Sequence, residues 1–173
     1  MNPLIKFERA INSNYQANSK TKMASIDRMD WHYGGDFPRD LHVENAGTHI
    51  GMYLTWIIQN DLIGQIHLKE SASAILKVKT RVQTGRDFLI EQCDEKFWDQ
   101  DLNEEGLAFT LYYYQGESTD DFKNYLDDYC EQLGQDVESL YEIENNWENY
   151  DKLLTVLNTR FAEWKLKKIK LNQ

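Results

Sequence analysis

Cysteine and proline are scarce in this chain of 173 residues, which contains two of each. The two cysteines, Cys93 and Cys130, form no CxxC pair and lack metal-finger spacing, which predicts reduced thiols that pack as small apolar side chains. No run approaches the roughly 20 apolar residues of a membrane-spanning helix, and the N-terminus lacks the apolar core of a secretory signal. These absences predict a cytoplasmic protein that is stabilised by a hydrophobic core rather than by disulfides.

The short motifs of common enzyme chemistries are also missing. The sequence contains no GxxxxGK[ST], GxGxxG, GxSxG or HExxH segment and no cysteine-histidine arrangement typical of a nucleophile. Nucleotide-dependent and acyl-transfer chemistry therefore have no support in the sequence. The absence of these motifs favours a binding protein over an enzyme, and we expect no cofactor.

Positive charge is nearly absent from one part of the chain. Residues 91–151 contain 19 Asp and Glu residues but only two basic ones, Lys96 and Lys123, which gives this part a net charge of −17 against −10 for the whole chain. Such a field repels nucleic acid and raises the encounter rate of a cationic partner. Acidic composition also serves solubility, so the charge by itself leaves both interpretations open.

Hydrophobic periodicity predicts an all-α fold, a single compact domain of about five to six helices over residues 26–173. A loosely structured N-terminal extension over 1–25 precedes it. Apolar residues at helical spacing predict a central buried helix over 45–62 and a long final helix over 146–168. Between the extension and the central helix, glycine and proline residues predict an irregular loop over 30–47.

Four further helices are predicted in the middle of the chain. The segment 84–93 opens with Thr-Gly-Arg-Asp, a capping box in which hydroxyl and carboxylate satisfy each other's main-chain donors. The segment 118–133 opens with Ser-Thr-Asp-Asp, which has the same spacing, and ends at Gly134. Apolar spacing predicts helices over 71–82 and 107–114, although the aromatic residues of the latter also suit a strand.

Histidines and carboxylates gather in the irregular loop and the start of the helix after it. Imidazole and carboxylate together are what a zinc or iron site, or an acid-base pair, uses. The spacing matches no defined motif, and the alternative is a loop held by aromatic packing and polar contacts. The candidate ligands are His32, Asp36, His42, Glu44 and His49.

The segment 99–105 alternates acidic and amide side chains in the manner of an EF-hand calcium loop. Its sixth position, where the turn requires glycine, is Glu104, and its twelfth, where a bidentate glutamate belongs, is Thr110. Acidic residues at the start of the following helix are the simpler interpretation.

Four lysines close the chain between residues 165 and 170. Lysines near a helix C-terminus complement the helix dipole, which explains them without a ligand. We therefore expect neither a membrane nor a nucleic acid as partner.

Five segments of the sequence resemble a family of small uncharacterised bacterial proteins, defined by sequence and without an established activity. The resemblance covers about residues 30–165 and implies a bacterial cytoplasmic single domain, but it transfers no catalytic residues. The segments are DWHYGGDFP (30–38), ENAGTHIGMYLTWII (44–58), TGRDFLIEQCDEKF (84–97), DLNEEG (101–106) and WENYD (147–151).

Small acidic bacterial proteins without catalytic motifs look like the immunity partners of secreted antibacterial toxins. The active site of a nuclease is cationic, so a dense acidic surface with aromatic anchors binds it fast and tightly. We expect an immunity protein that neutralises a cognate basic toxin, such as a nuclease. The alternatives are a metal-binding protein or metal-dependent enzyme that uses the 30–49 segment, and an adaptor that self-associates. The expected partner-binding residues are Asp120, Asp121, Asp127, Asp128, Glu142, Glu144 and Glu148.

Overall fold

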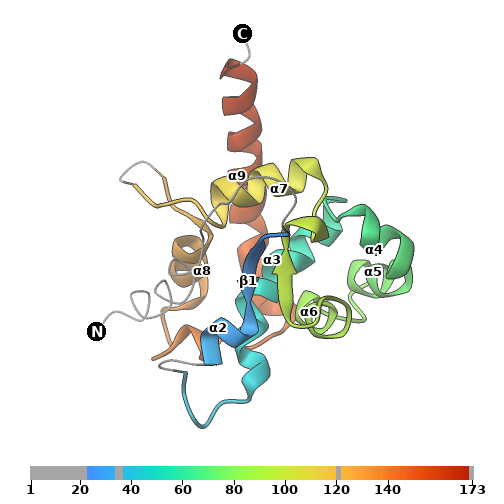
Figure 1. Cartoon of the computed structure of the whole chain (residues 1–173). Coiled ribbons are helices and arrows are strands. Elements are labelled where there is room, and N and C mark those ends of the chain that lie inside the picture. The colour runs from blue at the N-terminus through green and yellow to red at the C-terminus, as the bar shows by residue number, and fades with distance from the viewer. Residues whose placement is uncertain (1–22, 34–36, 120–121, 172–173) are drawn as a thin grey trace.

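The computed structural model describes residues 23–33, 37–119 and 122–171. Within these residues there are eight α-helices and one sheet of two short strands, which confirms the predicted all-α class (Figure 1). The elements are, in chain order, β1 (Ser25–Arg28), α2 (Met29–Tyr33), the 3-10 helix η1 (Val43–Gly47), α3 (Thr48–Gln59), α4 (Gln65–Glu70), α5 (Ala72–Lys79), α6 (Gly85–Cys93), β2 (Lys96–Trp98), η2 (Asp99–Asp101), α7 (Glu104–Tyr113), α8 (Tyr125–Leu133), η3 (Leu140–Glu142) and α9 (Trp147–Leu171).

Helix α3 is the centre of the hydrophobic core. Eleven of its twelve residues, from Thr48 to Ile58, are buried. A helix that is apolar on all sides must be covered on all sides, and α3 contacts α5, α6 and α9. The prediction of a central buried helix is therefore confirmed, although the start of the predicted range forms the separate turn η1.

Two glycines allow α3 and α6 to cross at close range. A Cβ atom on Gly85 would lie 2.1 Å from the carbonyl oxygen of Gly51, and one on Gly51 would lie 2.4 Å from the main chain of Arg86. The Thr55 hydroxyl joins the two helices, because it donates to Gly51 O and accepts from Gly85 N–H, both at 2.9 Å. The predicted capping box at the start of α6 is present, with Thr84 as its first residue.

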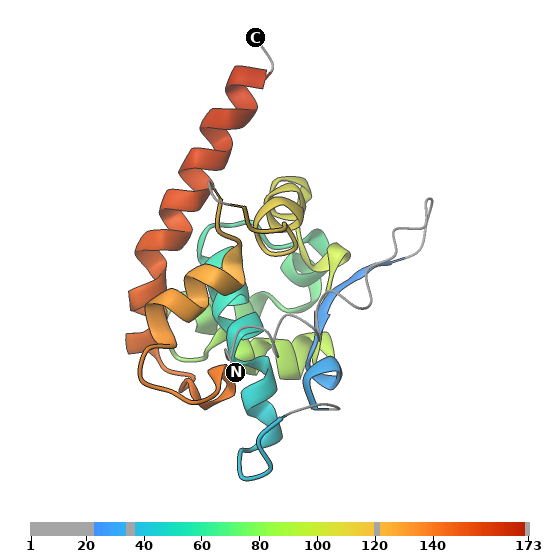
Figure 2. The same cartoon turned by 90° about the vertical axis from the view of Figure 1, so that its left-hand side faces the viewer.

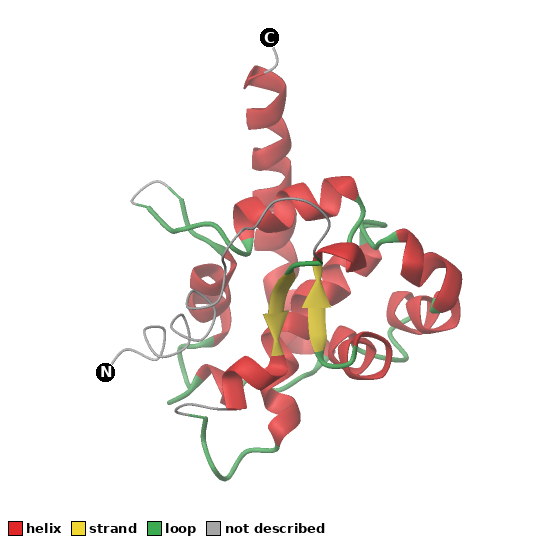
Figure 3. Cartoon of the chain, in the orientation of Figure 1, coloured by secondary structure: helices red, strands yellow, loops and turns green. Residues whose placement is uncertain are grey.

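The two strands form a small antiparallel ladder that the sequence analysis did not predict (Figure 3). Asp27 of β1 is opposite Phe97 of β2, and Arg28 is opposite Lys96. Ser25, the last residue of the predicted N-terminal extension, begins β1; residues 1–22 of that extension lie outside the described residues. The ladder places β1 and its direct continuation α2 against the helical core.

The start of α8 differs from the prediction. The helix begins at Tyr125, and its cap is Asn124, whose side chain accepts from the Asp127 N–H. Ser118 acts earlier: its hydroxyl accepts the N–H of Asn124 at 2.9 Å and so closes the turn before the helix. The predicted boundary was wrong because two polar residues with similar capping ability lie six positions apart.

The structure also describes the helix predicted over 71–82 and the segment that resembles a calcium loop. The helix expected over 71–82 is α5, and the short helix α4 precedes it without having been predicted. The segment that resembles a calcium loop ends in a helix cap, because the Asn103 side chain accepts the N–H of Gly106. This confirms the interpretation of Glu104 and Glu105 as acidic residues in the first turn of α7.

The last helix, α9, packs on the core as far as Trp164 and then continues past the other helices (Figures 1 and 2). Trp164 is buried, whereas Leu166 and Ile169 further along are exposed. Lys165 pairs with Glu105 of α7. In the described part of the chain, none of the helices combines the length and apolar character that crossing a membrane requires.

Candidate functional site

A completely buried carboxylate, that of Asp27, is the centre of the candidate site. Its Oδ1 atom accepts from the Arg28 N–H at 2.7 Å and from His32 Nε2 at 3.0 Å. Its Oδ2 atom accepts from the Tyr114 hydroxyl at 2.6 Å and from His49 Nε2 at 3.1 Å. An ionised carboxylate has about four acceptor positions, so these four donors fill its capacity.

Four separate elements supply these groups. Asp27 is on β1, and His32 follows on α2, which continues β1 without an intervening loop. His49 is in the first turn of α3, and Tyr114 caps the C-terminus of α7. The cluster therefore joins the small sheet to two helices that are distant in sequence.

The two histidines also contact each other and a further tyrosine. The ring centroids of His32 and His49 are 4.7 Å apart in an edge-to-face arrangement. His32 Nδ1 lies 2.8 Å from the Tyr141 hydroxyl, so both ring nitrogens of this histidine have partners. Tyr141 in turn packs on Phe37, which ties the segment before η1 to η3.

The electrostatics of the cluster favour an ionised aspartate beside a neutral His49. Burial alone raises the pKa of Asp27, but the charge of His32 and the hydrogen bonds from both histidines lower it below its ordinary value. Burial lowers the pKa of His49 to about 4, against the opposing effect of its hydrogen bond to Asp27. This arrangement ties the stability of the cluster to pH.

Of the predicted metal ligands, the structure brings two together. His32 and His49 meet on Asp27, and one ligand atom from each of these three side chains lies within 4.8 Å of the others. His42 and Glu44 lie instead on the surface, where His42 Nδ1 is 3.7 Å from a Glu44 carboxylate oxygen. Asp36 lies outside the described residues.

A second buried cluster of the same size consists of His67, Cys93 and Asp101. His67 Nε2 is 2.9 Å from Asp101 Oδ1 and 3.8 Å from Cys93 Sγ. Cys93 is thus buried and reduced, as predicted, but it has polar neighbours rather than only apolar ones.

Asp128, one of the predicted partner-binding residues, is buried and performs a structural role. Its carboxylate accepts two hydrogen bonds from Arg160, at 2.8 and 3.1 Å, and one from the Tyr113 hydroxyl at 2.8 Å. It joins α8 to α7 and α9. A residue with a side chain 2% exposed does not contact a partner in this conformation.

The other predicted acidic residues lie at the surface where the structure describes them. Glu144 and Glu148 are exposed, and Asp127 and Glu142 are half-buried. Glu148 pairs with Lys152 at 3.2 Å. Asp120 and Asp121 lie outside the described residues.

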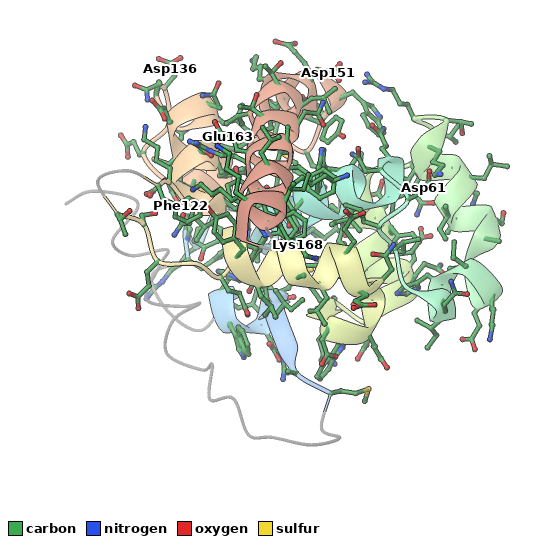
Figure 4. All side chains as sticks on the ribbon, turned by 90° about the horizontal axis from the view of Figure 1, so that it is seen from above. Asp61, Phe122, Asp136, Asp151, Glu163 and Lys168 are labelled. Carbon is green, nitrogen blue, oxygen red and sulfur yellow. The ribbon has the colours of Figure 1, made fainter. Side chains whose placement is uncertain are left out.

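The surface charge is concentrated in a stretch that we call the acidic segment, residues 124–151, which contains no lysine or arginine. Its two ends are neutralised by Lys123, Arg81 and Lys152, each paired with an acidic residue. Figure 4 shows Asp136 and Asp151 on the same side of the molecule, where α8 and α9 lie side by side. Among the described residues, no cation lies within 4.0 Å of the carboxylates in the middle of the segment, which are Asp136, Glu138, Glu142 and Glu144.

The aromatic residues of the acidic half belong mainly to the core. Tyr113, Tyr125 and Tyr129 are fully buried. Trp147 is half-buried, with the guanidinium of Arg81 4.9 Å from its ring centroid.

Sequence patterns did not single out Asp27, Tyr114 or the cluster around His67 as parts of a site. Asp27 stands with Arg28 between Ile26 and Met29, a local pattern that does not distinguish a buried carboxylate from an exposed one. His67 likewise had no signal, since it is an isolated histidine on a short helix.

The fold and its buried polar centre define a small, mostly helical domain in which α3 carries the core and Asp27 links sheet and helices. The chain belongs to the family described as "Domain of unknown function (DUF7832)", whose model matches residues 25–143. The match includes both buried clusters and ends before α9. No curated protein and no solved structure matches the chain.

Proposed function

We propose that this chain is an acidic protein-binding module of the immunity class, which neutralises a cognate basic antibacterial toxin by direct binding in the bacterial cytoplasm. The observation that carries the proposal is the middle of the acidic segment, where four carboxylates have no cation within 4.0 Å among the described residues. Uncompensated surface charge of one sign attracts a partner of the other sign and accelerates the encounter. A toxin that binds nucleic acid must carry such a cationic surface.

The structure changes which residues are offered for this role. Asp128 is withdrawn because it pairs with Arg160 in the interior. Asp136 and Glu138 are added because both are exposed and lie within the acidic segment. Glu142 and Glu144 remain from the partner-binding residues that the sequence predicted.

Binding kinetics test the proposal. The basic partner is sought as the product of a neighbouring gene, and its association with the purified chain is measured at low and moderate salt. We expect a 1:1 complex whose association rate falls as salt rises, because screening shortens the range of the attraction. Co-expression should also protect a bacterium from the toxin.

Two variants with equal net charge separate a local surface from general acidity. The first carries Asp136→Asn, Glu138→Gln, Glu142→Gln and Glu144→Gln. The matched control replaces four exposed carboxylates elsewhere, as Asp40→Asn, Glu70→Gln, Glu104→Gln and Glu117→Gln.

We expect the first variant to slow association and to lose its salt dependence, whereas the control stays close to the parent protein. Equal effects of the two variants would mean that the partner is attracted by overall negative charge and not by the acidic segment. Association that is independent of salt in the parent protein would contradict it.

A second candidate function, metal binding by Asp27, His32 and His49, is favoured by the convergence of two predicted ligands on one carboxylate. Two histidines and a carboxylate are a common ligand set for iron or zinc. Binding there has to displace the donors that already fill Asp27. Metal analysis of the protein and of His49→Gln tests it, since only the parent protein should retain a stoichiometric ion.

A further inference from the structure

The second buried cluster differs from the first in the acceptor capacity that it leaves open. Asp101 accepts one hydrogen bond on each oxygen, from His67 Nε2 at 2.9 Å and from the Trp98 N–H at 2.7 Å. Asp27 accepts four. A carboxylate with free acceptor positions can coordinate an ion while it keeps the hydrogen bond from Trp98, and the ion takes the place of the bond from His67 Nε2.

The donor types and their spacing also suit a metal. A thiol, an imidazole and a carboxylate converge, with Cys93 Sγ 3.8 Å from His67 Nε2. In a tetrahedral zinc site, donors at ordinary bond lengths are roughly 3.3–3.6 Å apart. The observed separations of 2.9 and 3.8 Å lie on either side of this range.

A main-chain contact joins α4 to η2, and ring packing joins α4 to α6, the three elements that carry these side chains. The N–H of Gly64, which caps α4, donates to Asp101 O at 2.7 Å. A Cβ on Gly64 would lie 2.3 Å from Gln100 O, so glycine is what allows α4 to approach η2 so closely. Phe88 packs edge-to-face on the His67 ring, which fixes its orientation.

We propose that His67, Cys93 and Asp101 form a binding site for Zn²⁺, with water in the fourth position. A dication with one thiolate and one carboxylate gives a site of zero net charge, whereas at Asp27 the same ion would leave one positive charge buried. His67, Cys93 and Asp101 also retain 5%, 7% and 3% exposure, so an ion reaches the site with a small movement of the surface.

Binding of Zn²⁺ at this site moves two protons. Zn²⁺ displaces one proton from the Cys93 thiol to solvent, and the proton of His67 moves from Nε2 to Nδ1. There it is donated to Ser71 Oγ, which lies 3.4 Å away and provides the outer partner that metal-bound histidines usually have. Because binding releases the Cys93 proton, affinity should increase with pH.

Cobalt titration tests the site, because Co²⁺ adopts zinc geometry and its bond to a thiolate produces a near-ultraviolet charge-transfer band. The protein is purified with a histidine-free tag, stripped with chelator and titrated with Co²⁺ and then Zn²⁺. We expect one equivalent of Co²⁺, a thiolate band, and displacement by Zn²⁺. Zinc should also raise the unfolding temperature.

Matched variants assign the ligands. Cys93→Ser should abolish the band and the zinc-dependent thermal shift, while Cys130→Ser should keep both, since Cys130 lies in another helix. Ser71→Ala should weaken binding by about 10–100-fold through loss of the outer partner. If Cys93→Ser does not fold, as judged by circular dichroism, His67→Gln is measured in the same way.

Three results would overturn the proposal. These are failure of the parent protein to bind Co²⁺, binding without a thiolate band, and a band that survives Cys93→Ser. Loss of the ion in His49→Gln, with retention in Cys93→Ser, would assign the metal to Asp27 instead. The toxin-binding experiment is independent of all these outcomes.

Discussion

The hydroxyl of Tyr114 donates a hydrogen bond of 2.6 Å to Asp27 Oδ2 across 87 positions of sequence. Asp27→Asn should lower the free energy of unfolding by about 3–5 kcal/mol, because an amide accepts at one atom only and turns its own N–H groups toward donors. Urea unfolding at neutral pH measures the change.

The control for this substitution is Asp30→Asn, three residues away. Asp30 pairs with Arg28 on the surface, and a pair so exposed contributes less than about 1 kcal/mol. Similar losses in the two variants would mean that Asp27 acts only as a polar surface residue does, contrary to its complete burial.

Acid should destabilise the fold, and His49 sets the upper part of the pH range. Its pKa is about 4 in the folded protein and 6.5 ordinarily, so between these values the unfolded chain binds more protons. Stability from this group is complete above pH 6.5 and is lost as pH falls toward 4, a total of about 3 kcal/mol. Below that, the lowered pKa of Asp27 continues the loss in the same direction.

His49→Gln isolates the contribution, because glutamine keeps a donor for Asp27 but does not titrate. Unfolding free energies of both proteins are measured between pH 7 and 4. The curve of the parent protein should fall more steeply than that of the variant over this range. Parallel curves would show that His49 is not held neutral by its surroundings.

Local patterns predicted the helical class because they report local interactions. The capping box at Thr84 and the apolar spacing over α3 need only a few neighbouring residues, and both the cap and the buried helix appear in the structure. Strands β1 and β2 need each other over about 70 positions of sequence, so neither has a local signature. Asn124 and Ser118 show the limit of capping rules, since either residue fits the pattern and tertiary contacts decide.

The candidate site was half predictable for a similar reason. His32 and His49 stood out because they are histidines beside acidic residues, but the carboxylate that joins them lies in a strand outside the predicted loop. Composition likewise identified the acidic part of the chain, residues 91–151, and not which of its acidic residues are buried. Asp127 and Asp128 are adjacent in sequence, and only the contact with Arg160 distinguishes their roles.

These two aspartates give a direct comparison. Asp128→Asn leaves the Arg160 guanidinium without its charge partner in a partly buried setting and should cost roughly 2–3 kcal/mol. Asp127→Asn removes a charge from the first turn of α8 and should cost less than about 1 kcal/mol. Chemical denaturation of both variants checks the order, and the reverse order would contradict the structural role of Asp128.

The close crossing of α3 and α6 predicts whether replacement of a glycine there stabilises or destabilises the protein. Gly85 is the first residue of α6, where alanine would normally favour the helix by up to about 1 kcal/mol. In this position the added Cβ would lie 2.1 Å from Gly51 O, so the helices must separate. Gly85→Ala should therefore destabilise the protein by about 1–3 kcal/mol or more.

Ser73→Ala is the matched control for helix propensity, since Ser73 is exposed on α5 and should gain slight stability on substitution. Thermal unfolding of both variants gives the comparison. Separation of the helices would also break the hydrogen bond from Gly85 N–H to Thr55 Oγ1. Thr55→Ser retains the hydroxyl that accepts this bond, so Gly85→Ala should destabilise the Thr55→Ser protein as well. A stabilising effect of Gly85→Ala would show that α6 does not approach α3 closely enough to exclude a methyl group.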